Sequence, residues 1–217
     1  MISPPCRAVL GIVLTAALWG CETQTPYVPW PGARAPLDTE TGPPTFTPGD
    51  EFWFHRGAGS IVLEVFTGME DGLLVFRRDL ENETRYYSRG LSLVKVLRPL
   101  GTDRWFDPDD GVLDFPLAVG KTWTRTFDTW TSRTLRRVQR RRACEVVDAG
   151  QATVPGGSFA AYRIDCTLRE LAKAPVVHEE FLYAPAVGRI IQHYTADDGI
   201  VSQLTEFTRA PAPPAGN

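Results

Sequence analysis

Hydrophobic and polar residues alternate in short runs along most of the chain, a pattern typical of β-strands separated by turns. In residues 61–66 (Ile-Val-Leu-Glu-Val-Phe), the odd-numbered positions are uniformly apolar and the even-numbered ones are mixed, because they include Glu64. Turn residues such as Glu70-Asp71-Gly72 separate the runs. No segment shows a convincing helical stripe, so the pattern indicates strands almost throughout.

The pattern predicts a large antiparallel meander. Its eleven predicted strands are Asp50–Arg56, Ser60–Thr67, Leu73–Leu80, Thr84–Ser88, Leu91–Leu97, Thr122–Thr131, Leu135–Val147, Phe159–Leu168, Val176–Tyr183, Arg189–Tyr194 and Val201–Phe207. We therefore expect an all-β protein with a single domain, whose sheet is either strongly curved or closed into a barrel. Strand number and strand length do not separate these two forms.

Two flanks lack this pattern. From residue 22 to residue 49 the chain carries seven prolines among threonines and glycines, which favours an extended, semi-rigid tether. Residues 209–217 are small and Pro-rich and are expected to be disordered. The sequence thus predicts a tether over residues 21–49 and an antiparallel β domain over residues 50–208.

The first 20 residues form a separate unit. Arg7 precedes an apolar run over residues 8–19, which is too short to cross a hydrocarbon layer of about 30 Å as a helix but suits a secretory signal. The run closes in Leu-Trp-Gly-Cys, residues 18–21, which resembles the lipobox of bacterial lipoproteins. The resemblance implies a lipoprotein signal peptide over residues 1–20, and a diacylglyceryl group and usually an amino-terminal acyl chain such as palmitate on Cys21.

Two other interpretations of this segment stay open, namely an ordinary secretory signal with an incidental Cys21 and an uncleaved anchor helix. Two or three acyl chains on Cys21 would hold the mature protein on a membrane. In lipoproteins resembling this one, a residue other than Asp after the cysteine tends to mean the outer membrane, and Glu22 stands there. We therefore expect a lipid-anchored protein of the bacterial cell envelope, at the outer membrane.

Composition and charge bound the class of protein. Removal of residues 1–20 takes away one of the 23 basic side chains and none of the 26 acidic ones, which leaves a formal charge of −4. This charge gives no sign of a nucleic-acid partner. The chain is 43% hydrophobic, which is ample for one core of about 160 residues.

Three stretches in the second half carry a family resemblance. They are residues 115–123 (Phe-Pro-Leu-Ala-Val-Gly-Lys-Thr-Trp), residues 153–164 (Thr-Val-Pro-Gly-Gly-Ser-Phe-Ala-Ala-Tyr-Arg-Ile) and residues 183–190 (Tyr-Ala-Pro-Ala-Val-Gly-Arg-Ile). Their order and spacing are similar to those of bacterial envelope β-proteins of unknown function, often lipoproteins, related to the domain-of-unknown-function 3108 and TapB-like families. The resemblance covers about residues 110–207 and implies a fold and a compartment. It carries over no catalytic residues.

The cysteines suit an exported protein. Cys6 lies in the signal and Cys21 is the predicted anchor, so Cys144 and Cys166 remain as a pair. They stand on two predicted strands that are joined around residues 150–158, so a disulfide is predicted, with two buried thiols as the alternative. No metal site is expected, because no histidine or further cysteine stands at ligand spacing. No cofactor is predicted either.

An arginine-rich segment is the strongest binding candidate. Six arginines fall within ten residues, and they are Arg133, Arg136, Arg137, Arg140, Arg141 and Arg142. Grouped on one or two strands, they would present a positive patch to lipid phosphates or to an acidic polysaccharide. The alternative is a solvated hairpin edge, paired with Asp128, Glu145 or Asp148, whose like charges discourage edge-to-edge aggregation.

Two functions of different classes remain. The first is a non-enzymatic binding module, in which a concave sheet or barrel mouth holds a lipid or an anionic glycan and therefore needs an accessible apolar cavity. The second is a structural or assembly lipoprotein that holds another envelope protein by a strand edge or by the arginine patch. His55, His178 and His193 are scattered, with no nucleophile or carboxylate at diagnostic spacing, so no catalytic residue is predicted and no enzyme is expected.

Overall fold

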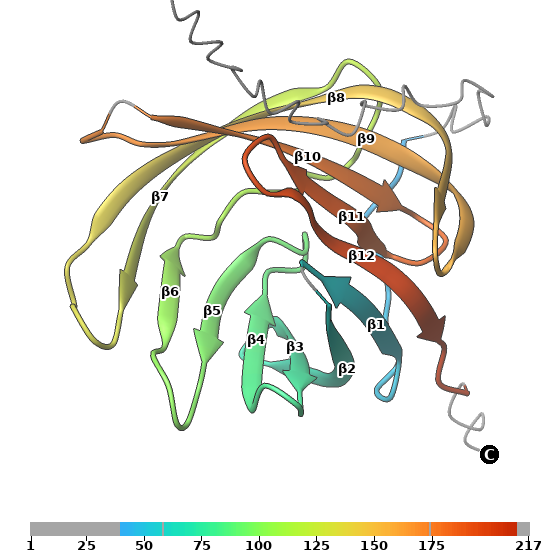
Figure 1. Cartoon of the computed structure of the whole chain (residues 1–217), viewed down its shortest axis with the longest axis horizontal. Coiled ribbons are helices and arrows are strands. Elements are labelled where there is room, and N and C mark those ends of the chain that lie inside the picture. Colours follow the sequence, from blue (N-terminus) through green and yellow to red (C-terminus); the bar gives the residue numbers. More distant parts are fainter. Residues whose placement is uncertain (1–39, 58, 174, 212–217) are drawn as a thin grey trace, which may run out of the picture.

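Twelve antiparallel strands close into one barrel in the part of the chain that the structure, a computed structural model, describes (Figure 1). The described residues are 40–57, 59–173 and 175–211, so the predicted signal peptide, Cys21, the tether up to residue 39 and the tail from residue 212 lie outside them. The strands are β1 (Glu51–Arg56), β2 (Ser60–Glu70), β3 (Leu73–Arg78), β4 (Glu83–Tyr87), β5 (Leu93–Leu97), β6 (Arg104–Asp107), β7 (Thr122–Thr131), β8 (Val138–Val154), β9 (Gly157–Glu170), β10 (Val176–Ala184), β11 (Arg189–Thr195) and β12 (Gly199–Thr208).

Each strand pairs with its neighbours in the sequence, and β1 pairs with β12 to close the sheet. The predicted all-β class and antiparallel meander are confirmed, and of the two forms left open by the sequence the structure has the closed barrel. Figure 1 shows the long strands β8 and β9 arching across one side of the barrel, with the shorter strands β1–β6 on the opposite side. Among the described residues, no helix is long and apolar enough to span a membrane.

The strand prediction missed one strand and misplaced several strand ends. It missed β6, whose four residues pair with β5 through only two residue pairs, so the local signal was too short to detect. It also began the eighth strand of the barrel at Leu135, which instead adopts a positive φ of 50° in the turn before β8. Such a backbone conformation is unfavourable for a branched side chain inside a strand and belongs to a turn.

In β2 the side of the strand with mixed polarity faces the barrel interior, and the uniformly apolar side faces outward. The mixed positions Val62, Glu64 and Phe66 are buried inside the barrel. The uniformly apolar positions lie outside, and Ile61 has 55% of its surface exposed. The barrel therefore takes a charged carboxylate into its interior at Glu64.

One part of the interior is filled by apolar side chains. Phe52, Phe66, Phe76 and Tyr87 form a cluster, in which the Phe66 and Phe76 ring centroids lie 5.2 Å apart. The loop between β6 and β7 folds inward and contributes three more buried side chains, which are Val112, Leu113 and Leu117. This packing leaves the remaining interior space to polar groups.

The barrel begins packing earlier than the predicted boundary at residue 50. Residues 40–49, placed in the tether from the sequence, include Thr41, which forms a β-bridge with Leu117. The Phe46 ring lies 5.2 Å from the Phe76 ring, so this segment joins the aromatic cluster. Proline content alone could not predict that this segment packs on the barrel, because the packing depends on the contact between Phe46 and Phe76.

The described start of the predicted tail is likewise held. Arg209 donates a hydrogen bond of 2.7 Å to the carboxylate of Asp50 and another of 2.7 Å to the carbonyl of Val187. The backbone amide of Ala210 donates to the same Asp50 carboxylate. The prediction of disorder from residue 209 is therefore wrong for residues 209 and 210, because buried Asp50 holds them.

Candidate functional site

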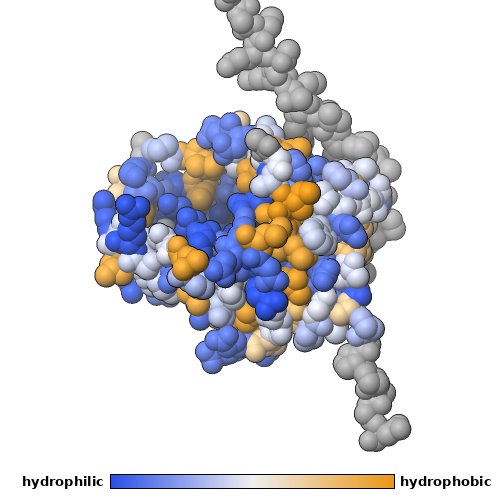
Figure 2. All heavy atoms as spheres, turned by 60° about the horizontal axis from the view of Figure 1, so that its bottom comes forward, coloured by the Kyte–Doolittle hydropathy of each residue, from blue (hydrophilic) through white to orange (hydrophobic). Residues whose placement is uncertain are grey.

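A polar cavity of about 220 Å³ lies inside the barrel, and it concentrates most of the buried charge of the molecule. Figure 2 shows a hollow lined by hydrophilic side chains on the face at the bottom of Figure 1. The charged or titratable side chains that line the cavity are Arg56, Glu64, Arg78, Arg85, Asp110, Arg142, Glu179, Arg189 and His193. Apolar side chains such as Phe54 and Phe181 line the rest.

Glu64 is the centre of the first ion-pair network. Only 1% of its surface is exposed, and it accepts a hydrogen bond of 2.6 Å from Nε of Arg78 on β3. Its second carboxylate oxygen accepts a hydrogen bond from Arg189 on β11. The Arg189 guanidinium also lies 4.3 Å from the centroid of the Phe76 ring, a cation–π contact. Glu64 therefore ties the β2–β3 wall to β11 across the barrel.

This arrangement shifts the acid–base equilibrium of Glu64. Burial alone would raise the pKa of its carboxyl group, but the positive charges of Arg78 and Arg189 outweigh burial and lower the pKa to about 2. The carboxylate thus stays ionised in the barrel interior throughout the physiological range.

Glu83 on β4 organises a second group of arginines. It is 1% exposed, pairs with Arg85 on its own strand, and accepts a hydrogen bond of 2.7 Å from Nε of Arg98. Arg78 lies 3.5 Å away and links this group to Glu64. Burial would raise the pKa of Glu83, yet Arg85 and the other arginines lower it. The two glutamates therefore share one continuous network of fixed positive charges.

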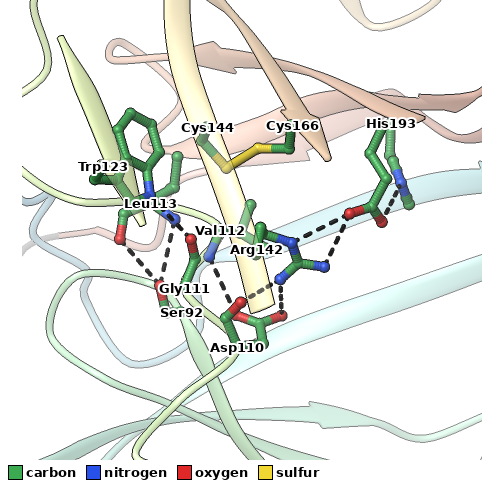
Figure 3. The surroundings of a disulfide bond; sticks show 11 residues. Ser92, Asp110, Gly111, Val112, Leu113, Trp123, Arg142, Cys144, Cys166 and His193 are labelled. Carbon is green, nitrogen blue, oxygen red and sulfur yellow. Dashed lines mark hydrogen bonds and ion pairs between the residues drawn. A yellow bond between two sulfur atoms is a disulfide. The ribbon is translucent and has the colours of Figure 1, made fainter. Parts of the chain in front are cut away.

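Arg142 on β8 forms the third part of the site (Figure 3). Its Nε and Nη2 atoms donate to the same oxygen of Glu179, at 3.1 and 3.0 Å. Its Nη1 atom lies 3.5 Å from the Asp110 carboxylate and also donates to the Asp110 backbone carbonyl. On the far side of Glu179, Nε2 of His193 lies 3.4 Å from the other carboxylate oxygen. The His193 ring stacks on Phe181 at 4.5 Å, which fixes its orientation.

The carboxylates around Arg142 have opposite pKa shifts. For Glu179, burial would raise the pKa, but the contact with His193 and the charge of Arg142 lower it. For Asp110, burial dominates and raises the pKa, although Arg142 and two backbone amides oppose the shift. Burial thus favours the protonated form of Asp110, whereas His193 and Arg142 favour the ionised form of Glu179.

The predicted disulfide between Cys144 and Cys166 is confirmed. The two residues lie directly opposite each other on β8 and β9, with Cα atoms 4.1 Å apart. Figure 3 shows the bond beside Arg142, which is two residues earlier on β8. The cross-link thus holds the strand from which Arg142 reaches into the cavity.

The six arginines of the candidate patch do not form one surface. Arg142 is 5% exposed and points into the barrel, where its partners neutralise it, so its assignment to a surface patch was wrong. Arg137 is exposed but lies 3.5 Å from the Asp128 carboxylate and 4.4 Å from the Trp130 ring. The expected pairing with Asp128 is therefore present, formed by Arg137.

The other four arginines of the segment divide between two faces. Arg133, Arg136 and Arg141 are exposed. Arg140 shares the inward side of β8 with Arg142, and its Nε atom is buried without a hydrogen-bond partner among the described residues. The alternation of β8 separates Arg140 and Arg142 from Arg141, because successive side chains of a strand point to opposite faces. Anion binding by this segment stays a prediction.

Sequence reasoning missed the interior charges. Glu64, Arg78 and Arg189 are separated by up to 125 residues, and no motif links them. The one available signal was a charge at an even-numbered position of β2, between Val62 and Phe66, which are both buried. Read alone, that position is equally compatible with a solvent-facing side.

No group of three or more His, Cys, Asp or Glu side chains in the described part of the chain is arranged to hold a metal ion. The residues of the cavity are instead arranged for anions or hydrogen-bonding groups, since arginine guanidinium groups dominate its lining.

Comparison with known proteins identifies the fold. No protein-family model and no curated protein matches the chain, so the resemblance to the domain-of-unknown-function 3108 and TapB-like families is not confirmed. The structure is similar to that of the hypothetical lipoprotein YmcC from Escherichia coli, with a TM-score of 0.53, 13% sequence identity, and coverage of 80% of this chain and 92% of that one. The likeness at this identity shows a shared YmcC-like fold.

Two further solved structures are more distant. One is a protein from Bacteroides fragilis described as having a YmcC-like fold, with a TM-score of 0.44, 12% identity, and coverage of 79% of this chain and 100% of that one. The other comes from Parabacteroides distasonis, with a TM-score of 0.40, 12% identity, and coverage of 78% and 100%.

Proposed function

We propose that this protein is a lipoprotein of the bacterial cell envelope, anchored through Cys21 at the outer membrane, which binds an anionic ligand in its barrel without chemical conversion. The lipobox-like residues 18–21, the disulfide and the likeness in fold to the hypothetical lipoprotein YmcC support the compartment. Glu22 after the cysteine supports the outer membrane.

The charged cavity inside the barrel is the observation that carries the binding function. Five arginines and three carboxylates line it, so guanidinium groups outnumber carboxylates at its wall. Glu81 and Glu83, which pair with Arg56 and Arg85, do not line it. An acyl chain placed there would remove water from these charges without replacing their hydrogen bonds, and this is costly. An anionic group would instead receive charge-assisted hydrogen bonds from guanidinium groups. The cavity therefore favours the acidic end of a lipid or glycan over its apolar part.

The buried carboxylates of the cavity also support a non-catalytic binding role. Glu64 holds Arg78 and Arg189, and Glu179 holds Arg142 and His193. A carboxylate held in this way acts as a fixed counter-ion for arginine side chains. Such a carboxylate holds the guanidinium groups in place around the space that a ligand would occupy.

The anchor is tested by changing Cys21 to Ser in the full chain expressed with export. The wild-type chain is expected in the membrane fraction with the mass of a diacylated or triacylated protein. The Cys21→Ser variant is expected in the soluble fraction with no added lipid mass. An unchanged membrane fraction and an unchanged mass in the variant would contradict the lipoprotein assignment.

Ligand binding is tested by native mass spectrometry of the exported full chain, released from detergent micelles, with solvent extraction of whatever accompanies it. Ser202 lines the cavity, so Ser202→Phe places a ring in the space that the ligand needs. The wild type and the matched Ser202→Ala control are expected to retain an anionic lipid or glycan adduct that Ser202→Phe loses. An adduct of equal occupancy in all three proteins would place the ligand elsewhere.

A groove on the outside of the barrel favours the second function, assembly with another envelope protein. It has a volume of about 590 Å³ and crosses β7–β11. Three carboxylates, of Glu145, Asp165 and Glu180, lie directly opposite one another on β8, β9 and β10 along it. Burial raises the pKa of Glu180, with Arg163 opposing and Asp165 adding to the shift.

Such a groove suits a basic segment of a partner protein. Contact through a strand edge is disfavoured, because the barrel pairs all twelve described strands on both sides. An exported chain without any adduct, recovered together with an envelope protein that is released when Glu145 and Asp165 are changed to Gln and Asn, would favour assembly over ligand binding.

A further inference from the structure

A second cavity, of about 210 Å³, lies where β6, β7 and β8 meet, at the end of β8 that follows the arginine-rich hairpin. Three arginines line it: Arg104 on β6, Arg136 in the turn between β7 and β8, and Arg140 on β8. Threonine hydroxyl groups from Thr129 and Thr131 on β7 complete its polar wall. Thr134 and the apolar side chains of Phe106, Trp130 and Val138 form the rest of the lining, so all its charged side chains are positive.

These arginines differ from those of the 220 Å³ cavity inside the barrel in their partners. Every arginine that lines that cavity lies within ion-pair distance of a carboxylate. Among the described residues, no carboxylate lies within that distance of Arg104, Arg136 or Arg140. The Nε atom of Arg140 is moreover buried without any hydrogen-bond partner in the described structure. Three guanidinium groups without a carboxylate partner at the wall of one cavity form an arrangement that an anionic acceptor would complete.

The positive charges around Arg104 reinforce one another. Partial burial lowers the pKa of Arg104, and the neighbouring cations Arg98, Arg140 and Arg85 lower it further, with only partial compensation from Glu83. Mutual repulsion of this kind is relieved when an anion enters the space between the guanidinium groups. Arg104 and Arg140 face the same cavity, so a single ligand can satisfy both.

We propose that Arg104 and Arg140 form a recognition site for a phosphate monoester of the ligand bound by the barrel, separate from the acidic group that the cavity inside the barrel holds. This inference deepens the proposed function and rests on it. A phosphate monoester carries about −1.5 to −2 charges at pH 7 and has three acceptor oxygens. It therefore neutralises two guanidinium groups and still accepts from the threonine hydroxyls. A single carboxylate has one charge and leaves one arginine uncompensated.

The size of the cavity agrees with a headgroup rather than a whole lipid. At about 30 Å³ per water molecule, 210 Å³ corresponds to roughly seven waters, which is enough for a phosphate with part of its first sugar or glycerol. Sites that enclose a whole drug-sized ligand are usually about 300–1,000 Å³. The remainder of the ligand must extend out of this cavity, so a phospholipid and a phosphorylated glycan share the recognised chemistry.

The test is calorimetric titration of the full chain in detergent with inorganic phosphate. The variant Arg104→Gln/Arg140→Gln removes the two charges at the cavity. The control Arg133→Gln/Arg141→Gln removes two exposed arginines from the same hairpin and strand, so it changes net charge equally. We expect the first variant to weaken phosphate binding roughly tenfold to a hundredfold and the control to leave it within about twofold.

Equal weakening by the two double variants would overturn the site, because it would show a general effect of net charge. Absence of phosphate binding to the wild type would overturn it as well. Circular dichroism of both variants checks that the barrel is folded. Titration with glucose 1-phosphate and with dispersed phosphatidic acid then distinguishes the sources, since tighter binding of either one, lost in Arg104→Gln/Arg140→Gln, supports the site and assigns it to a glycan or to a lipid.

Failure of this inference is distinguishable from failure of the proposed function. If native mass spectrometry shows an adduct that contains no phosphorus and persists in Arg104→Gln/Arg140→Gln, the phosphate site is overturned while ligand binding stands. If no adduct is found but inorganic phosphate binds in the expected pattern, the site stands and the assignment of a resident ligand fails.

Discussion

Changing Glu64 to Gln is expected to lower the free energy of unfolding by about 3–5 kcal/mol, the usual cost of removing one partner from a buried ion pair. The substitution preserves the shape of the side chain but leaves Arg78 and Arg189 without their shared counter-ion inside the barrel. Urea unfolding followed by tryptophan fluorescence measures the change. The matched control Glu206→Gln removes an exposed carboxylate from β12 and is expected to change stability by less than about 0.5 kcal/mol.

The same residue predicts how stability depends on pH. The pKa of Glu64 falls from 4.5 to about 2 on folding, so the folded state favours the ionised form. The stability contributed by this shift is fully present above pH 4.5 and is lost as the pH falls through about 2. The difference in stability between the wild type and Glu64→Gln should therefore narrow in this window. A constant difference from pH 6 down to pH 2 would contradict the role of Glu64 as an ionised counter-ion.

Removal of the disulfide, by changing both Cys144 and Cys166 to Ala, is expected to cost about 3 kcal/mol. The bond closes a loop with a sequence separation of 22 residues, and the chain-entropy estimate for such a loop is of this size. Denaturant unfolding without reductant compares the wild type with the double variant. A reductant should destabilise the wild type by a similar amount and leave the variant unchanged.

A wild-type protein that is as stable reduced as oxidised would show that the strand pairing alone holds β8 and β9. The two strands pair over many residues, from Arg140 opposite Glu170 to Val154 opposite Gly157. The disulfide therefore acts mainly on the unfolded chain, by limiting the conformations that it can adopt. Its position beside Arg142 also keeps that guanidinium in place relative to Glu179.

The arginine-rich segment shows that a local pattern of charge does not determine which side chains share one surface. Its density of positive charge is plain in the sequence, and Arg140 does line a cavity with an unpaired guanidinium. Arg142, two residues later, is equally basic but is neutralised by Asp110 and Glu179. Its two partners come from distant parts of the chain, and only the closed barrel brings them to the same point.

The aromatic residues near the amino-terminal boundary show a similar limit. Proline content made residues 40–49 look like part of the tether, yet Phe46 packs against Phe52 and Phe76 inside the barrel. Local composition describes the conformations that a segment prefers by itself. Whether an apolar side chain in that segment is buried depends on a surface built by other strands, and no local signal contains that information.

By itself, the sequence determined the class of this protein. Alternation with period two and frequent turn residues specified antiparallel strands, because these signals act between residues that are close in the chain. The even pair of cysteines on neighbouring predicted strands favoured the disulfide over two buried thiols, and the structure contains the bond. Only the tertiary structure decided closure of the barrel, the inward face of β2 and the pairing of Glu64 with Arg189. These features depend on contacts between residues far apart in the sequence, and their energy appears only when the twelve strands close around a common interior.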